Sequence, residues 1–124
     1  MNSKSRTNLI MNGKELAEKL SQIILHKLGE NILILDLRGV SPLTDFFVIT
    51  TASSTVHARA IAESLLDRKE TRGLRKPHHI EGMENAQWIL LDYFDVIVHI
   101  FTPDVREFYG LERLWGDVPQ RLVK

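Results

Sequence analysis

The chain has 124 residues, of which 44% are hydrophobic and 26% charged, a composition typical of one globular domain with a single core. Lysine plus arginine and aspartate plus glutamate number 16 each, so the formal net charge is zero, whereas proteins that grip nucleic acid through its phosphates are usually basic. Cysteine is absent, which excludes disulfides and thiol catalysis, and no apolar run approaches the roughly 20 residues that span a bilayer. We therefore expect a protein of the cytoplasm, with an organellar matrix as the alternative, that has no membrane partner and for which nucleic acid is not the main contact.

The first predicted element is a helix that begins at Asn12. Residues 1–11 show no periodicity and are predicted to be a flexible N-terminal leader. Asn12 and Glu15 have the spacing of a capping box, and apolar residues then recur at helical spacing. Gly29 is the expected stop.

Two strands and a second helix are predicted next. The run 31–37 carries four consecutive apolar residues, which indicates a strand covered on both faces, and a second strand is predicted at 46–51. Because the connection between them is short, we expect them to be antiparallel neighbours. The segment 52–55 is typical of a helix cap, and apolar spacing predicts a helix that runs to about Arg72.

The third region, residues 87–101, contains two apolar runs that are separated by the short segment Asp92–Asp95, which has an acidic residue at each end. It is predicted to be a β-hairpin in the middle of the sheet. Its two-residue loop is predicted to be Tyr93-Phe94. Pro77 makes the preceding segment 74–80 a poor central strand, so we expect it at an edge. After the hairpin, Pro103 suits the first position of a short third helix that ends at Gly116.

These elements predict an α/β fold: a single domain over residues 12–118, with a mixed five-stranded sheet flanked by helices. Residues 119–124 are predicted to be a C-terminal tail.

Few residues suggest chemistry. Ala52-Ser53-Ser54, between a strand and a helix, could hold a phosphate on backbone amides, but a plain helix cap explains them better. Asp92 and Asp95 flank the hairpin loop and could bind magnesium or transfer protons, although such residues are also ordinary turn formers. The five histidines show no ligand spacing. We predict no catalytic residue, no metal site and no cofactor.

Several motifs, read together and in order, resemble the ribosomal silencing factor (iojap-like) family. They are Leu43–Thr50, Glu81-Gly82, Trp88–Tyr93, Asp95–Phe101 and Phe108–Trp115. Each is weak alone, and their order makes the match specific.

The resemblance implies an α/β fold related to nucleotidyltransferases but without their activity. It also implies binding to the large ribosomal subunit through its ribosomal protein fourteen, which blocks joining of the small subunit and represses translation. Free members of the family are commonly homodimers. The sequence agrees that catalysis is missing, because the Asp-x-Asp pair that would hold two metal ions does not follow Ala52-Ser53.

The partner surface is predicted to include Glu81, Trp88, Asp92, Tyr93 and Asp95. These acidic and aromatic residues cluster around one hairpin, and a ribosomal protein is expected to offer basic residues to them.

Two positions depart from the family pattern, which has glycine at both Ala52 and Phe94. A bulky aromatic residue at positive φ is a strong outlier, so we predict that the loop has changed its turn type and that Phe94 has a negative φ. Two other functions remain open at this point: a nucleotide-binding or nucleotidyltransferase-type enzyme, suggested by the implied fold, and a small RNA-binding module, which the charge balance disfavours.

Overall fold

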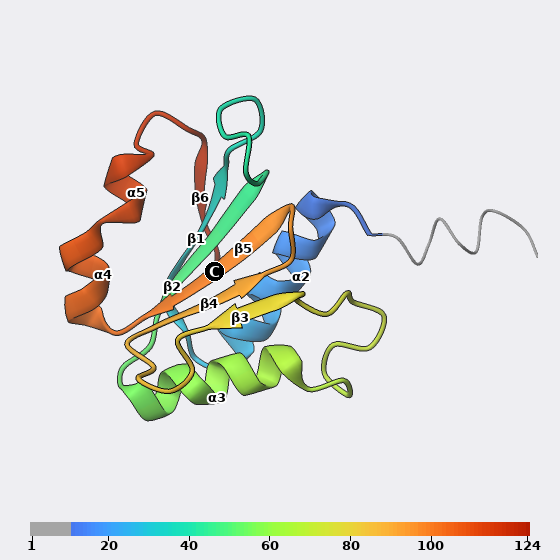
Figure 1. Ribbon diagram of the computed structural model, residues 1–124, viewed down its shortest axis with the longest axis vertical. Coiled ribbons are helices and arrows are strands. Elements are labelled where there is room, and N and C mark those ends of the chain that lie inside the picture. The colour runs from blue at the N-terminus through green and yellow to red at the C-terminus, as the bar shows by residue number, and fades with distance from the viewer. Residues whose placement is uncertain (1–10) are drawn as a thin grey trace, which may run out of the picture.

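The computed structural model describes residues 11–124, and the predicted leader lies outside this range apart from Met11. One six-stranded sheet with the order β3-β4-β5-β2-β1-β6 forms the centre of the molecule (Figure 1). Strands β2 and β5 are parallel, and the other neighbouring pairs are antiparallel. Among the described residues no helix has the length and apolar character needed to cross a membrane.

The helices and strands have the following bounds: α2 Gly13–His26, β1 Glu30–Asp36, β2 Phe46–Thr51, α3 Thr55–Leu66, β3 His79–Glu81, β4 Trp88–Asp92, β5 Val96–Phe101, α4 Pro103–Tyr109, α5 Leu111–Leu114 and β6 Gln120–Leu122. The predicted α/β class, the antiparallel pairing of β1 with β2 and the edge position of β3 are confirmed.

Local sequence explains where the two long helices begin. The Asn12 side chain accepts a hydrogen bond from the backbone N–H of Glu15 at 2.9 Å, so the predicted N-cap of α2 is confirmed. Ser54 caps α3 in the same way, through the backbone N–H of His57 at 3.1 Å. Each cap satisfies one of the amide groups that a helix N-terminus leaves without an intrahelical partner.

The five-strand prediction is wrong, because a sixth strand comes from residues assigned to the C-terminal tail. Strand β6 pairs antiparallel with β1, with Leu122 opposite Leu33 and Gln120 opposite Leu35. Val123 follows it and is buried in the core. A run of only three exposed residues carries no strand periodicity that could be recognised in the sequence, so only the free edge of β1 determines the pairing.

Two helix predictions also need correction. Helix α3 ends at Leu66, six residues before the predicted Arg72. The Arg68 guanidinium donates to the carbonyl oxygen of Leu74 at 2.8 Å, and the Thr71 hydroxyl donates to that of Asp67 at 2.8 Å, so these residues form an ordered loop. The predicted third helix is divided into α4 and α5 by Gly110, which has a φ of 54°.

The nucleotidyltransferase-like relationship stays a prediction, since the architecture above establishes only a mixed sheet with helices beside it.

Candidate functional site

The two faces of the sheet differ in what covers them. Along β4, Ile89 and Leu91 are fully buried and belong to the core cluster that includes α2 and α3. Their neighbours Trp88, Leu90 and Asp92 alternate to the other face and are only half-buried. Helices α4 and α5 lie beside the sheet on the left of the view, and they cover this second face only in part (Figure 1).

We call this second surface the open face. Register partners on neighbouring strands share a face, which adds His79 and Glu81 of β3 and Ile97 of β5 to the β4 residues. It comprises Trp88, Leu90, Asp92, His79, Glu81 and Ile97, together with Phe108 and Tyr109 of α4.

Trp88 is the anchor of the open face. Its indole Nε1–H donates to Nδ1 of His99 at 3.0 Å. Its ring lies 4.8 Å from that of Phe101 and 4.7 Å from that of Tyr109, measured between centroids. One edge of the indole is therefore fixed by the sheet, while the residue remains partly accessible. Aromatic residues held rigidly in this way are enriched at the centres of protein interfaces.

His99 lies beneath Trp88 and has no charge at neutral pH. Only 4% of it is exposed, and burial lowers its pKa to about 3. The Phe47 ring packs edge-on against the imidazole at 4.5 Å. Because Nδ1 accepts the indole hydrogen bond, the proton of the neutral ring must be on Nε2. The histidine thus holds Trp88 in place and does not act as a base.

Two of the predicted acidic residues share the open face. Asp92 is opposite His79 in the pairing of β3 with β4, and Glu81 is opposite Leu90. The Glu81 carboxylate contacts Nε2 of His79 at 2.6 Å. Gly82 follows with a φ of 86°, and a Cβ there would collide with the Trp88 backbone, so glycine is required where the chain turns toward β4.

Tyr93 and Asp95 are placed elsewhere, and the structure does not bring them to the open face. Tyr93 is only 1% exposed and belongs to the core on the α2 and α3 side. Burial raises the pKa of its hydroxyl. Asp95 is next to Gly13 of α2 and forms an ion pair with Arg75 at 2.9 Å. Both residues therefore act within the fold.

The hairpin loop differs from the prediction in two ways. The Tyr93 N–H donates to the Val96 carbonyl oxygen at 2.8 Å, so the two loop residues are Phe94 and Asp95. Phe94 has a φ of 75°, so the predicted negative φ is wrong. The Asp95 N–H bonds the Tyr93 carbonyl at 3.1 Å, which makes Phe94 the centre of a γ-turn, a strained conformation for a residue with a side chain.

Two contacts hold Phe94 in this conformation. The Asp92 side chain accepts its backbone N–H at 2.8 Å, and its ring stacks on His78 with centroids 3.3 Å apart. Even so, 67% of the residue is exposed. The ring of His78 thus supports the strained turn at the edge of the open face.

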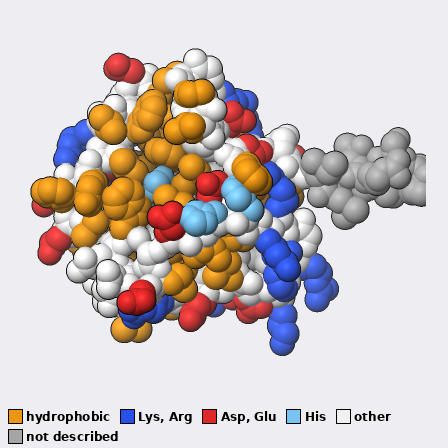
Figure 2. Space-filling view, viewed as in Figure 1, with side chains coloured by type: hydrophobic (Ala, Val, Ile, Leu, Met, Phe, Trp, Pro, Cys, Tyr) orange, Lys and Arg blue, Asp and Glu red, His pale blue; other side chains and the backbone are white. Residues whose placement is uncertain are grey.

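Sequence reasoning missed part of this surface. Phe108 and Leu114, apolar residues of the predicted third helix, are 79% and 73% exposed. Figure 2 shows hydrophobic side chains gathered over the centre and left of the view, with acidic and histidine side chains among them. Helical spacing identifies an apolar stripe but not whether anything covers it, so the spacing alone could not have revealed this exposure.

The polar residues after β2 serve the fold. Ser54 caps α3, as predicted, and His57 joins α3 to α2 by bonding Ser53 N–H at 2.9 Å and the Lys27 carbonyl at 2.9 Å. Within residues 11–124 no group of three or more histidine or acidic side chains is placed to hold a metal ion.

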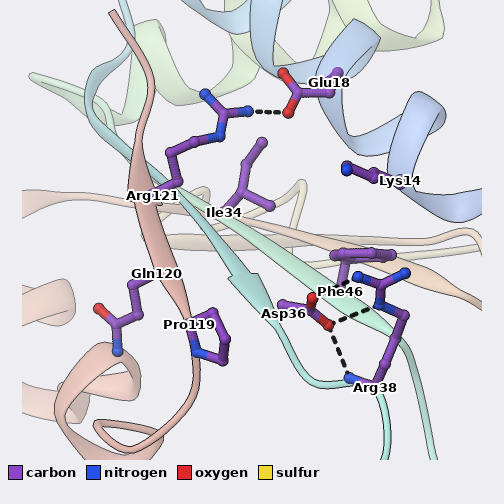
Figure 3. A pocket seen from close by; sticks show the side chains of 9 residues that line it. All are labelled: Lys14, Glu18, Ile34, Asp36, Arg38, Phe46, Pro119, Gln120 and Arg121. Carbon is purple, nitrogen blue, oxygen red and sulfur yellow. Dashed lines mark hydrogen bonds and ion pairs between the residues drawn. The ribbon is translucent and has the colours of Figure 1, made fainter.

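A pocket of about 180 Å³ lies between α2 and the β1–β6 edge (Figure 3). Arg38 pairs there with Asp36 at 2.7 Å, and Arg121 pairs with Glu18. Because both arginines already have carboxylate partners, the pocket does not resemble an anion site.

Comparison with known proteins gives a consistent result. The chain is 38% identical over 109 residues to the ribosomal silencing factor RsfS of Bacillus subtilis, covering 88% of this chain and 92% of that protein. It is 37% identical over 93 residues to the chloroplastic protein Iojap of Zea mays, covering 70% of this chain and 37% of that protein. A crystal structure of protein CV0518 from Chromobacterium violaceum aligns with a TM-score of 0.78 at 28% identity, covering 92% of this chain and 94% of that one.

The family model described as "Ribosomal silencing factor during starvation" matches residues 11–124, which is the whole range that the structure describes. The likeness therefore includes the open face, the hairpin and β6. The chain belongs to the ribosomal silencing factor family.

Proposed function

We propose that the open face docks on ribosomal protein fourteen of the large subunit and so prevents the small subunit from joining. Members of the family are non-enzymatic regulators that bind the large subunit and repress translation by blocking subunit joining. The proposal adds the surface of this chain that makes the contact, and a cytoplasmic site of action.

The observation that carries the proposal is the composition of the open face. Trp88 is held at its centre, exposed Phe108 and Tyr109 lie beside it, and carboxylates of Glu81 and Asp92 lie at its β3 side. Central aromatic anchors with a polar rim are typical of protein interfaces. The two carboxylates suit a basic partner and would speed encounter and fix register more than they add affinity.

The test is co-sedimentation of the purified chain with separated ribosomal subunits. We expect binding to the large subunit alone, and Trp88→Ala should weaken it by about 2 kcal/mol or more, which is roughly thirtyfold. Asp92→Asn should weaken it less. Circular dichroism must show that Trp88→Ala remains folded, because the indole also packs on Phe101.

Unchanged affinity in folded Trp88→Ala would remove the open face from the interface. A Trp88→Phe variant is the matched control, since it keeps an aromatic ring against Phe101 while it loses the bond to His99 and part of the ring area. It should bind better than Trp88→Ala.

We further propose that the free chain forms a homodimer. The support is the exposed apolar area on α4 and α5, since large exposed patches commonly mark contact surfaces. Sedimentation equilibrium of the wild-type chain and of Phe108→Ser measures this directly, and we expect the variant to shift toward monomer. If both sediment as monomers, the proposed dimer is wrong.

A nucleotide-transferring activity has no support in the geometry. Ser53 and Ser54 are engaged with His57 and the N-terminus of α3, and no metal-binding group of acidic residues lies among the described residues. Incubation with nucleotide triphosphates, magnesium and ribosomal RNA should give no product.

A further inference from the structure

The loop between α3 and β3 departs from the balanced charge of the chain. Residues 67–78 hold five lysine or arginine side chains against two acidic ones, whereas the whole chain has equal numbers. In the space-filling view, lysine and arginine side chains gather at the lower right, beyond the acidic and histidine residues of the open face (Figure 2). The positive charge is thus local and lies beside the proposed protein contact.

The loop is held in one conformation. Arg68 donates to the Thr71 hydroxyl at 3.1 Å as well as to the Leu74 carbonyl at 2.8 Å. Thr71 and Leu74 are buried, at 1% and 8% exposure. Lys69, Arg72 and Lys76 are exposed, and within residues 11–124 none of these three has a carboxylate within ion-pair distance. The loop therefore presents unpaired cations from a fixed backbone, which lowers the entropic cost of binding.

A groove of about 430 Å³ lies between this loop and α2. Apolar atoms of Ile23 and Leu74 line it, and Lys19 and Arg72 add positive charge. Glu70 is the acidic residue of its lining, and the Lys27 ammonium lies 3.6 Å from that carboxylate. An apolar surface next to cations matches the chemistry of a nucleotide, whose base is apolar on its faces and whose phosphate is negative.

We propose that this groove binds an unpaired nucleotide of large-subunit ribosomal RNA while the open face binds the ribosomal protein. The inference rests on the proposed function, which brings the chain to a surface made of both protein and RNA. The zero net charge of the chain then results from two regions of opposite charge. The acidic, aromatic open face binds a basic protein, and the basic groove binds RNA. A phosphate contact made by a few cations fixes position without reading sequence.

The first test is the salt dependence of binding to purified large subunits. We expect Lys19→Gln/Arg72→Gln to weaken binding and to reduce the slope of log affinity against log salt by about 1 to 2, because each phosphate contact releases about 0.7 of a counterion on single strands. The matched control is Lys14→Gln/Lys124→Gln, which removes the same charge away from the groove and should keep the wild-type slope. Thermal melts check that both variants fold.

The second test places a photoreactive benzophenone amino acid at position 22, where exposed Gln22 lines the groove. Illumination of the complex should crosslink the chain to ribosomal RNA. Crosslinks only to a ribosomal protein, or a salt slope equal to that of the control, would overturn the inference while leaving the open-face proposal intact. If the wild-type chain fails to bind large subunits at all, both proposals fall.

Discussion

The two faces of the central sheet are built from the same strands but carry different kinds of side chain. The face under α2 and α3 is mainly aliphatic and closed, with Val48, Ile89, Leu91 and Val98 all 0% exposed. The open face is aromatic and half-covered, and its Trp88 packs against His99, Phe101 and Tyr109 of α4. The closed face thus contributes most of the buried apolar core, while the open face holds fixed aromatic side chains that a partner can reach.

The largest expected effect is a difference in stability loss between two neighbouring residues of β4 that lie on opposite faces of the sheet. Leu91→Ala should lower the free energy of unfolding by about 3 kcal/mol, because it leaves a cavity in the closed core. Leu90→Ala, one residue away on the open face, should lower it by about 1 kcal/mol, since that site is already partly in contact with water. Urea denaturation of both variants measures the difference. Equal losses would show that the open face is as tightly packed as the closed one.

The next effect is the loss of folding stability at acidic pH that the buried, neutral His99 causes. Folding lowers the pKa of His99 from 6.5 to about 3, so the unfolded chain takes up a proton at a pH where the folded chain does not. Stability from this group is therefore complete above pH 6.5 and falls as the pH drops toward 3, by about 1.4 kcal/mol per unit, or about 2 kcal/mol between pH 6.5 and 5.

The measurement is the free energy of unfolding of wild type and of His99→Gln across that range. Between pH 6.5 and 3, the unfolding free energy of the variant should fall less steeply with decreasing pH, by about 1.4 kcal/mol per unit, which corresponds to one proton. This difference in slope is expected whatever the stability of the variant at neutral pH. A wild-type curve parallel to that of the variant would mean that folding does not lower the pKa of His99.

A smaller effect distinguishes Asp92 from Asp95, which were both predicted to lie on the partner surface. Asp95→Asn weakens the pair with Arg75 and should lower stability by about 1 kcal/mol, a modest value because both side chains are about a third exposed. Its binding to the large subunit should be unchanged. Asp92→Asn keeps the oxygen that accepts the Phe94 N–H, so the fold should persist while association slows. Stopped-flow association and thermal melts decide, and the reverse assignment of the two effects would place Asp95 on the interface.

The smallest effect is at the hairpin loop between β4 and β5, at the edge of the open face. Phe94→Gly relieves a φ of 75° but gives up the stack on His78 and adds chain entropy, so we expect a net gain of only about 0.5 kcal/mol. Phe94→Ala keeps the strained backbone without the ring and should be less stable than wild type. A lower melting midpoint for the glycine variant would show that the stack outweighs the strain.

Much of this protein was determined by the sequence alone. The segment 46–51 predicts a strand and the apolar run 96–101 a buried one. Asn12 and Ser54 mark the helix starts, because these signals act over neighbouring residues. The ordered motifs likewise identify the family, which the comparisons confirm. The placement of Glu81, Trp88 and Asp92 together on one face also follows from strand periodicity once the register is known.

Only the tertiary structure decided the remaining features, since each depends on groups far apart in the chain. Strand β6 exists because β1 offers it a free edge, and its three exposed residues carry no local signal. Tyr93 and Asp95 turn away from the open face because the loop begins one residue later than its sequence suggests, and a shift of one position in a strand exchanges its faces. The basic groove likewise forms only where the 67–78 loop meets α2, so net charge could not reveal it.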